Sequence, residues 1–145
     1  MKNLIFIFSL LLLSCGKNEM PSPDSNSQID DSSANMGMDF STQKLLLEGT
    51  FVNGAHPTSG KAKIYEASDG KKTLLLENFK TDAGPDLRIY IAEDKAITNF
   101  KELSMKVENG NKSYEIPSTV DLSKQKHILI WCKQFAVLFG HSELK

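Results

Sequence analysis

The side chain best suited to chemistry in this sequence is the thiol of Cys132, because the only other cysteine, Cys15, ends an apolar N-terminal run. The chain contains no Cys-x-x-Cys pair, which excludes a thioredoxin-like dithiol within one chain. An unpaired cysteine in an exported protein is either sequestered in the core or used chemically. The sequence leaves both roles open for Cys132.

Cys15 is expected to carry lipid. Lys2 precedes an apolar run at residues 4–13, and Leu-Leu-Ser leads directly into the cysteine. This pattern is typical of a secretory signal peptide, and the run is too short for a bilayer span, which needs about 20 apolar residues. The same residues fit the bacterial lipobox, whose cysteine is lipidated and becomes the mature N-terminus. The alternative is an ordinary signal peptide with a chance cysteine.

The strand-like run that ends at Cys132 bears on the role of the thiol. Alternation places Cys132 on the same face as Ile130 and turns Trp131 to the other side. Taken alone, this pattern favours a buried cysteine that acts as a small hydrophobic residue. A reactive thiolate needs a neighbouring cation, metal or helix N-terminus, and the nearby Lys133 and His127 alternate away from that face.

The three histidines, His56, His127 and His141, lack the short spacing of a zinc site. Any one of them could join Cys132 around a metal or haem iron, but each is more typical of a surface or turn position. No Ser-His-Asp order, Gly-rich phosphate loop or pair of catalytic carboxylates stands out. We therefore expect no metal site and no enzyme activity. A function as an electron carrier stays open.

Charge is balanced along this chain of 145 residues, with 17 Lys and Arg against 18 Asp and Glu and a net charge of −1 at pH 7. Such a balance offers no global field to attract nucleic acid or an anionic membrane. Basic residues also do not cluster with aromatic ones, which argues against a nucleic-acid partner.

Three segments are expected: a signal peptide at residues 1–14, a lipid-anchored flexible linker at 15–43 and a single β domain at 44–145. The linker is rich in Ser, Asn, Asp, Gly and Pro, so burial of apolar groups cannot offset the entropy of ordering it. Lipid on Cys15 would hold the chain at the cell envelope. Gly16, rather than an acidic residue, follows that cysteine, which favours the outer membrane.

Short apolar runs separated by turn residues predict an all-β sandwich or small barrel of about six to eight antiparallel strands. The expected strands are residues 45–52, 61–65, 73–79, 87–91, 113–116, 128–132 and 135–139. The last two are either separate strands or one bulged strand. Residues 96–103 could form one helical turn or an irregular loop.

Three turn signals punctuate these runs. Asp69-Gly70 predicts a hairpin with a type I′ turn, because this pair accepts positive φ, and Asn109-Gly110 is a second hairpin signal. Gly84-Pro85-Asp86 marks another turn, in which Asp86 is expected to bond nearby backbone amides.

Five short motifs occur in a distinctive order. They are Gly49-x-Phe51, His56-Pro57-x-Ser59-Gly60-x-Ala62-x-Ile64, Leu74-x-Leu76-x-x-Phe79, Gly84-Pro85-Asp86-Leu87-x-x-Tyr90 and Ile130-Trp131-Cys132-x-x-Phe135-x-Val137-x-Phe139-Gly140. In this order they resemble the DM-thirteen domain, the module of Skeletor-type proteins that also occurs alone in bacterial lipoproteins. The resemblance covers roughly residues 45–144.

The resemblance implies an electron-transfer domain, of a kind often attached to DOMON and cytochrome b-type membrane modules. It implies Cys132 as the redox group or covalent haem attachment point, Trp131 and His56 as further cofactor contacts, and a redox partner protein. The chain lacks the Cys-x-x-Cys-His signature of haem attachment. The alternative function is a non-enzymatic binding or adhesion module, in which Cys132 belongs to the core and a loop surface does the binding.

Overall fold

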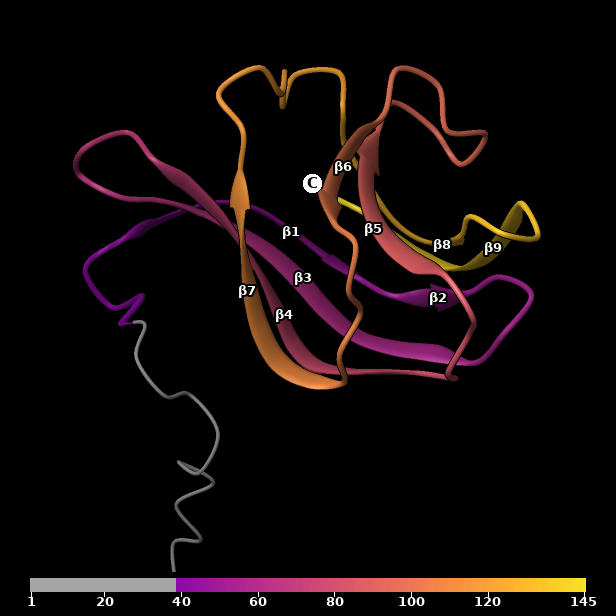
Figure 1. Ribbon diagram of the computed structural model, residues 1–145. Helices are drawn as coiled ribbons and strands as arrows, with labels where there is room; N and C mark the ends of the chain where they lie inside the picture. Colours follow the sequence, from indigo (N-terminus) through magenta and orange to yellow (C-terminus); the bar gives the residue numbers. More distant parts are fainter. Residues whose placement is uncertain (1–38) are drawn as a thin grey trace, which may run out of the picture. The chain divides into compact units, whose positions relative to one another are not determined.

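The computed structural model describes residues 39–145, which form two β-sheets (Figure 1). The expected signal peptide, the lipid site at Cys15 and the linker up to residue 38 lie outside the described residues, so they stay predictions. Residues 39–145 contain no helix, and hence none long and apolar enough to cross a membrane.

Nine strands in residues 39–145 form two antiparallel sheets, with the order β1-β3-β4-β7 in the first and β2-β9-β8-β5-β6 in the second. The strands are β1 (Lys44–Thr50), β2 (Val52–Asn53), β3 (Thr58–Glu66), β4 (Lys72–Thr81), β5 (Leu87–Ala92), β6 (Lys101–Ser104), β7 (Gly110–Ile116), β8 (His127–Cys132) and β9 (Val137–Glu143). The predicted all-β sandwich is therefore confirmed. The count exceeds the expected six to eight because β2 and β6 are short and mostly exposed, with little apolar pattern to reveal them.

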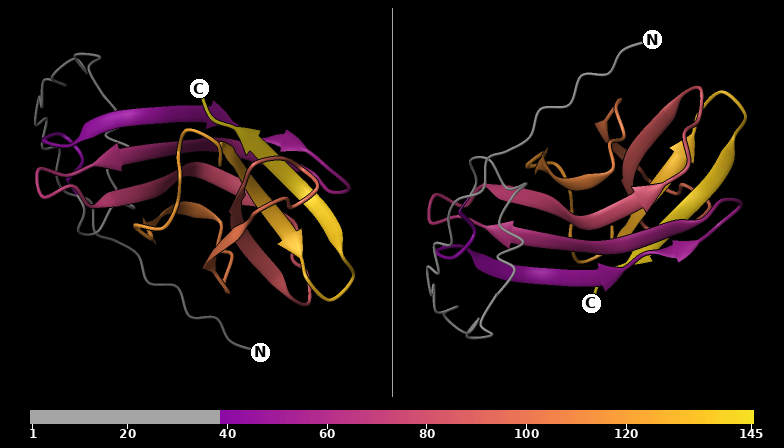
Figure 2. Two further views of the ribbon diagram at one scale, coloured as in Figure 1. Left: turned by 90° about the horizontal axis from the view of Figure 1, so that it is seen from above. Right: turned by 90° about the horizontal axis from the view of Figure 1, so that it is seen from below.

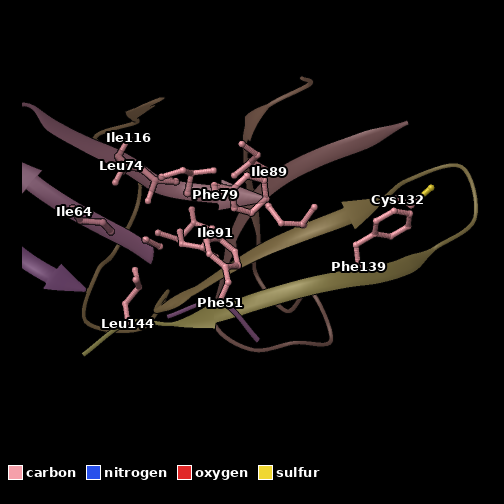
Figure 3. Packing of buried hydrophobic residues seen from close by; sticks show 14 residues of the cluster. Phe51, Ile64, Leu74, Phe79, Ile89, Ile91, Ile116, Cys132, Phe139 and Leu144 are labelled. Carbon is pink, nitrogen blue, oxygen red and sulfur yellow. The ribbon is translucent and has the colours of Figure 1, made fainter. Parts of the chain in front are cut away.

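The core lies between the two sheets, where every second side chain points inward (Figure 3). Ile64 and Leu74 of the first sheet share this cluster with Ile89, Ile91 and Ile130 of the second, and all five are completely buried. Full burial of one such side chain stabilises the fold by about 1.5–3 kcal/mol. Alternating apolar residues on both sheets therefore explain why the sheets stay together.

Phe51 marks the point where the chain passes from the first sheet to the second. The single strand predicted at residues 45–52 is in fact divided, because β1 ends at Thr50 and β2 begins at Val52. The Phe51 ring is buried and meets Phe79 edge-on, with centroids 4.9 Å apart. This aromatic contact stabilises the crossing between the sheets.

A second apolar group, the outer cluster, covers the outer face of the second sheet. Its buried members are Tyr90, Ala92 and Leu129, and its partly buried members are Ile97, Trp131 and Leu138. Trp131 belongs to this outer cluster, whereas Cys132 belongs to the core. The alternation predicted for this strand is therefore confirmed.

The predicted hairpin at Asp69-Gly70 exists, but the type I′ turn predicted for it is wrong. β3 and β4 are paired up to this point. A type I′ turn requires positive φ at both central residues, yet in this turn only Gly70 has one, at +82°. Two backbone hydrogen bonds of 2.9 Å close the turn instead, from Gly70 N–H to Ala67 O and from Ala67 N–H to Lys71 O.

The signal at Asn109-Gly110 does not form the predicted hairpin. β6 pairs with β5 and β7 pairs with β4, so the chain crosses between the sheets here. The segment at residues 96–103 is irregular up to residue 100 and then becomes β6. The C-terminal apolar run forms two separate strands, β8 and β9, paired with each other as a hairpin.

Candidate functional site around Cys132

Cys132 is the last residue of β8, and its side chain is completely buried. Its Cα lies opposite Leu87 of β5 on one side and Val137 of β9 on the other. Figure 3 shows the sulfur at the end of the core where Phe139 also lies. Cys132 is a free cysteine, without a disulfide partner in residues 39–145. The thiol is thus inside the core but at its margin.

The turn between β8 and β9 lies next to this margin. Its four residues, 133–136, are exposed, and Ala136 adopts a left-handed φ of +53°. The Lys133 N–H donates a hydrogen bond of 2.9 Å to the backbone carbonyl oxygen of Asp86. This bond fixes the turn against the loop that joins β4 to β5.

The Asp86 side chain pairs with Arg88 and does not bond turn amides as predicted. Arg88 Nε donates to Asp86 Oδ1, and Arg88 Nη1 lies 3.4 Å from Glu102 Oε1. The hydrogen bond to Asp86 raises the pKa of Arg88 above its usual value. Arg88 is the strand partner of Trp131, on the face away from Cys132. The guanidinium is therefore engaged outside the core.

A hollow of about 340 Å³ lies between the β4–β5 loop and the β6–β7 loop. Its lining residues are Thr81, Asp82, Ala83, Gly84, Pro85, Asp86, Leu87, Met105, Lys106, Val107 and Asn109. Cys132 does not line it, but its strand partner Leu87 does. A Cβ added to Gly84 would lie 2.8 Å from Leu87 Cδ2 and 3.0 Å from Phe139 Cζ, so this wall is tightly packed.

His56 lies on the other side of Phe139. The two rings stack with centroids 3.8 Å apart and planes 21° apart. His56 Nδ1 is 3.1 Å from Asp82 Oδ2, and both side chains are well exposed, at 39% and 53%. Asp82 also lines the hollow. The aromatic ring of Phe139 therefore connects the buried end of the core to an exposed imidazole–carboxylate pair.

Of the three candidate residues from the sequence, the structure brings two to the same end of the sandwich. Cys132 and His56 both lie near Phe139, whereas Trp131 belongs to the outer cluster. Leu87 and Phe139 could not be assigned to the site from the sequence. Both stood within the quoted motifs, but nothing in the motifs indicated which neighbour would shield the thiol.

Among residues 39–145, neither of the basic side chains closest to Cys132 in the β8–β9 turn and on β5 is available to activate the thiol. Lys133 is exposed on the turn, and Arg88 is held by Asp86 and Glu102. A thiolate is favoured by a nearby cation, a metal or a helix N-terminus. The described domain offers Cys132 an apolar shell instead, so its chemistry requires local movement.

Haem does not fit the residues around Cys132. A cofactor of this size needs an open, mostly apolar cavity, whereas the sulfur is completely enclosed and the adjacent hollow does not reach it. His56 Nδ1 is already engaged with Asp82. Within residues 39–145, no group of three or more His, Cys, Asp or Glu side chains could hold a metal ion.

Residues 39–145 thus form a two-sheet antiparallel sandwich with a buried free thiol at the end of its core. The family model described as "Electron transfer DM13" matches residues 50–144, about two thirds of the chain. The chain therefore belongs to the DM13 family, as the motif order predicted. No curated protein and no solved structure matches it.

Proposed function

We propose that this chain is an electron-transfer module of the cell envelope, anchored by lipid on Cys15, in which Cys132 is the redox-active group. The family description supports the class of function. The position of Cys132 carries its assignment, because it is the free thiol of the described domain and its strand partner forms part of the wall of a hollow. A partner that enters the hollow would therefore reach the Cys132 thiol once the Leu87 side chain, which forms part of the wall, moves aside.

The chemistry that suits a single enclosed thiol is exchange with a disulfide of a partner protein. Local opening at Leu87 and residues 133–136 lets Cys132 lose its proton to solvent. The thiolate attacks one sulfur of the partner's disulfide, a new S–S bond forms and the old one breaks, and the departing sulfur keeps the electron pair and takes up a proton. A second protein with a dithiol then completes the transfer: one of its thiols attacks the first partner's sulfur in the mixed disulfide and releases Cys132, and its other thiol then forms a disulfide within the second protein, so two electrons pass to the first partner.

The chain enters the described domain at the end of the first sheet that lies away from the hollow. Phe40 stacks on Tyr65, with ring centroids 4.6 Å apart, at the end of the first sheet that carries the β3–β4 hairpin. The hollow begins at Thr81, the last residue of β4. Figure 2 shows β4 running from the β3–β4 hairpin to the other end of the first sheet. Residue 39 and the proposed redox end therefore lie at opposite ends of this sheet.

The exchange reaction is testable with glutathione disulfide as the probe. The native domain should form a mixed disulfide at Cys132, seen by mass spectrometry, and Leu87→Ala should accelerate its formation at least about tenfold by thinning the wall. Leu138→Ala is the matched control, because Leu138 is a partly buried leucine of the outer cluster. Equal rates in both variants would contradict the route through Leu87, and no adduct in either would contradict the redox assignment.

The alternative is a binding module in which Cys132 is only a core residue. Two observations favour it: the Cys132 thiol is completely buried, and Cys132 is not among the residues that line the hollow of about 340 Å³. On this alternative, Cys132→Ala keeps the protein's activity, whereas substitutions in the hollow abolish it. Under the redox proposal, Cys132→Ala abolishes activity with the fold intact.

A further inference from the structure

Residues 93–100 form a strap on the outer face of the second sheet. This segment connects β5 to β6 (Figure 1). Ile97 of the strap packs against buried Tyr90 and Leu129 of the outer cluster. Phe100, at the other end of the strap, stacks on Tyr90 with ring centroids 4.5 Å apart. The strap therefore covers apolar surface that would otherwise face solvent.

The strap is conformationally strained. Ile97 has a φ of +59° and Asn99 a φ of +48°, both in the left-handed region. A β-branched residue there is an outlier that persists only where its surroundings enforce it. Asp94 Oδ1 supplies part of that enforcement, because it accepts hydrogen bonds from Ala96 N–H at 2.8 Å and Thr98 N–H at 3.1 Å.

Gln125 supplies a second restraint from outside the strap. Its side chain is 2% exposed, and its Nε2 donates to the carbonyl oxygen of Asn99. Its Oε1 accepts a hydrogen bond of 2.9 Å from Asp121 N–H. The strap is thus held in a strained shape by Asp94 on one side and Gln125 on the other.

Two histidines lie on the face that carries the strap. His127 of β8 and His141 of β9 share the outward side with Leu129, the Cα partner of His141. The Nδ1 atom of each imidazole is shielded from solvent and has no hydrogen-bond partner among residues 39–145. A neutral ring tolerates a bare Nδ1 lone pair, but a protonated ring would place an N–H donor there without an acceptor.

Burial and the nearby positive charges also oppose protonation of His141. Burial lowers the pKa of His141 below its usual value, and positive charge from Lys95 of the strap and from His127 lowers it further. Glu143 on β9, the Cα partner of His127, acts in the opposite direction on His141. A positive charge on His127 helps to lower the pKa of Asp94 on the strap, so this interaction favours the closed strap and opening depends on His141.

We propose that the strap is an acid-sensitive cover, which lifts when His141 is protonated and thereby uncovers Tyr90 and Leu129. Lifting hydrates the His141 imidazole, moves Lys95 away and relaxes Ile97, so these changes favour opening together. Because the pKa of His141 is lowered while the strap is closed, His141 binds a proton more readily when the strap is open. Closure is therefore fully present above the ordinary histidine pKa of about 6.5 and is lost as the pH falls below it.

Trp131 can report on this opening, because it is the single tryptophan of the chain and packs, like Ile97, against the buried residues of the outer cluster. Its fluorescence should shift to longer wavelength between neutral pH and about pH 5, while far-ultraviolet circular dichroism stays constant. The double variant His127→Gln with His141→Gln should lose the shift. His56→Gln is the matched control, because His56 pairs with Asp82 elsewhere, and it should keep the shift.

Lys95→Gln provides a second variant that leaves the sheet untouched, since Lys95 is exposed. Removing its charge should move the midpoint of the fluorescence change to lower pH through relief of the repulsion that drives opening. The proposal is overturned if the fluorescence does not change, if the double histidine variant keeps the full shift, if Lys95→Gln leaves the midpoint unmoved, or if circular dichroism is lost together with the fluorescence change.

Discussion

At the scale of single residues, Cys132 is shielded by packing and not by charge. Leu87 and Val137 flank it on the neighbouring strands, and the nearby basic side chains point elsewhere. Packing of this kind keeps a thiol inert until its neighbours move. His56 differs, because its ring is partly exposed and is held only by Phe139 and Asp82. The two residues at the same end of the sandwich therefore have opposite accessibility.

Substitution of Cys132 should separate packing from chemistry. Cys132→Ser places a hydroxyl in a completely buried apolar site, and an unpartnered buried polar group costs about 1–3 kcal/mol. Cys132→Ala should be the milder change, because it buries no polar atom. Urea unfolding of both variants measures the difference. Greater stability of the serine variant would show that Cys132 is more hydrated than its enclosure indicates.

At the scale of elements, strand faces could be predicted from sequence, whereas strand partners could not. Alternation placed Cys132 inward and Trp131 outward, and both placements are confirmed. The turn signal at Gly110 was real, since its φ is +99°, but the next strand pairs in the other sheet. Local residue types determine a reversal of the chain, while pairing depends on contacts that are distant in sequence.

The same limit applies to the candidate site. Cys132 and the Gly84-Pro85-Asp86 turn could be found as motifs, but the stacking of His56 on Phe139 requires β9 to lie beside the chain that follows β2. The pairing of Asp86 with Arg88, two residues away, was also missed. An aspartate in a turn satisfies either a backbone amide or a cation, and the sequence does not say which.

The packing of β9 against the start of β3 should be intolerant of a larger side chain at Gly140. A Cβ there would overlap Thr58, so Gly140→Ala should cost about 1–3 kcal/mol of unfolding free energy, as overpacking usually does. Gly70→Ala is the control, because the space around Gly70 is open and only its positive φ is unfavourable for alanine. If Gly140→Ala were the milder of the two in thermal unfolding, the close approach of these strands would be wrong.

At the scale of the whole molecule, the described domain begins before its first strand. Phe40 stacks on Tyr65, and Gln43 N–H donates to Phe40 O at 3.1 Å, so residues 39–43 take part in the fold. These contacts lie just before residue 44, where the sequence predicts the start of the domain. The family match starts later still, at residue 50. The opposite end of the first sheet carries the hollow and the candidate site.

Truncation should measure the contribution of that first segment. A chain that starts at Lys44 should keep the β-rich circular dichroism spectrum and unfold cooperatively, because the core lies within residues 44–145. It should be less stable than a chain that starts at Asp39 by about 0.5–1.5 kcal/mol, the usual value of an aromatic pair. When Tyr65→Ala is introduced into both chains, this difference between them should disappear. A difference that survives Tyr65→Ala would mean that another contact of residues 39–43 is responsible.

The central claim is that Cys132 becomes reachable by local opening of the folded domain. The most direct measurement is the rate at which a maleimide labels Cys132 in the native protein, compared with the rate of global unfolding under the same conditions. We expect labelling to be slower than that of the unfolded chain and much faster than unfolding, with a further increase in Leu87→Ala. Labelling that proceeds no faster than global unfolding would show that Cys132 is an inert core residue.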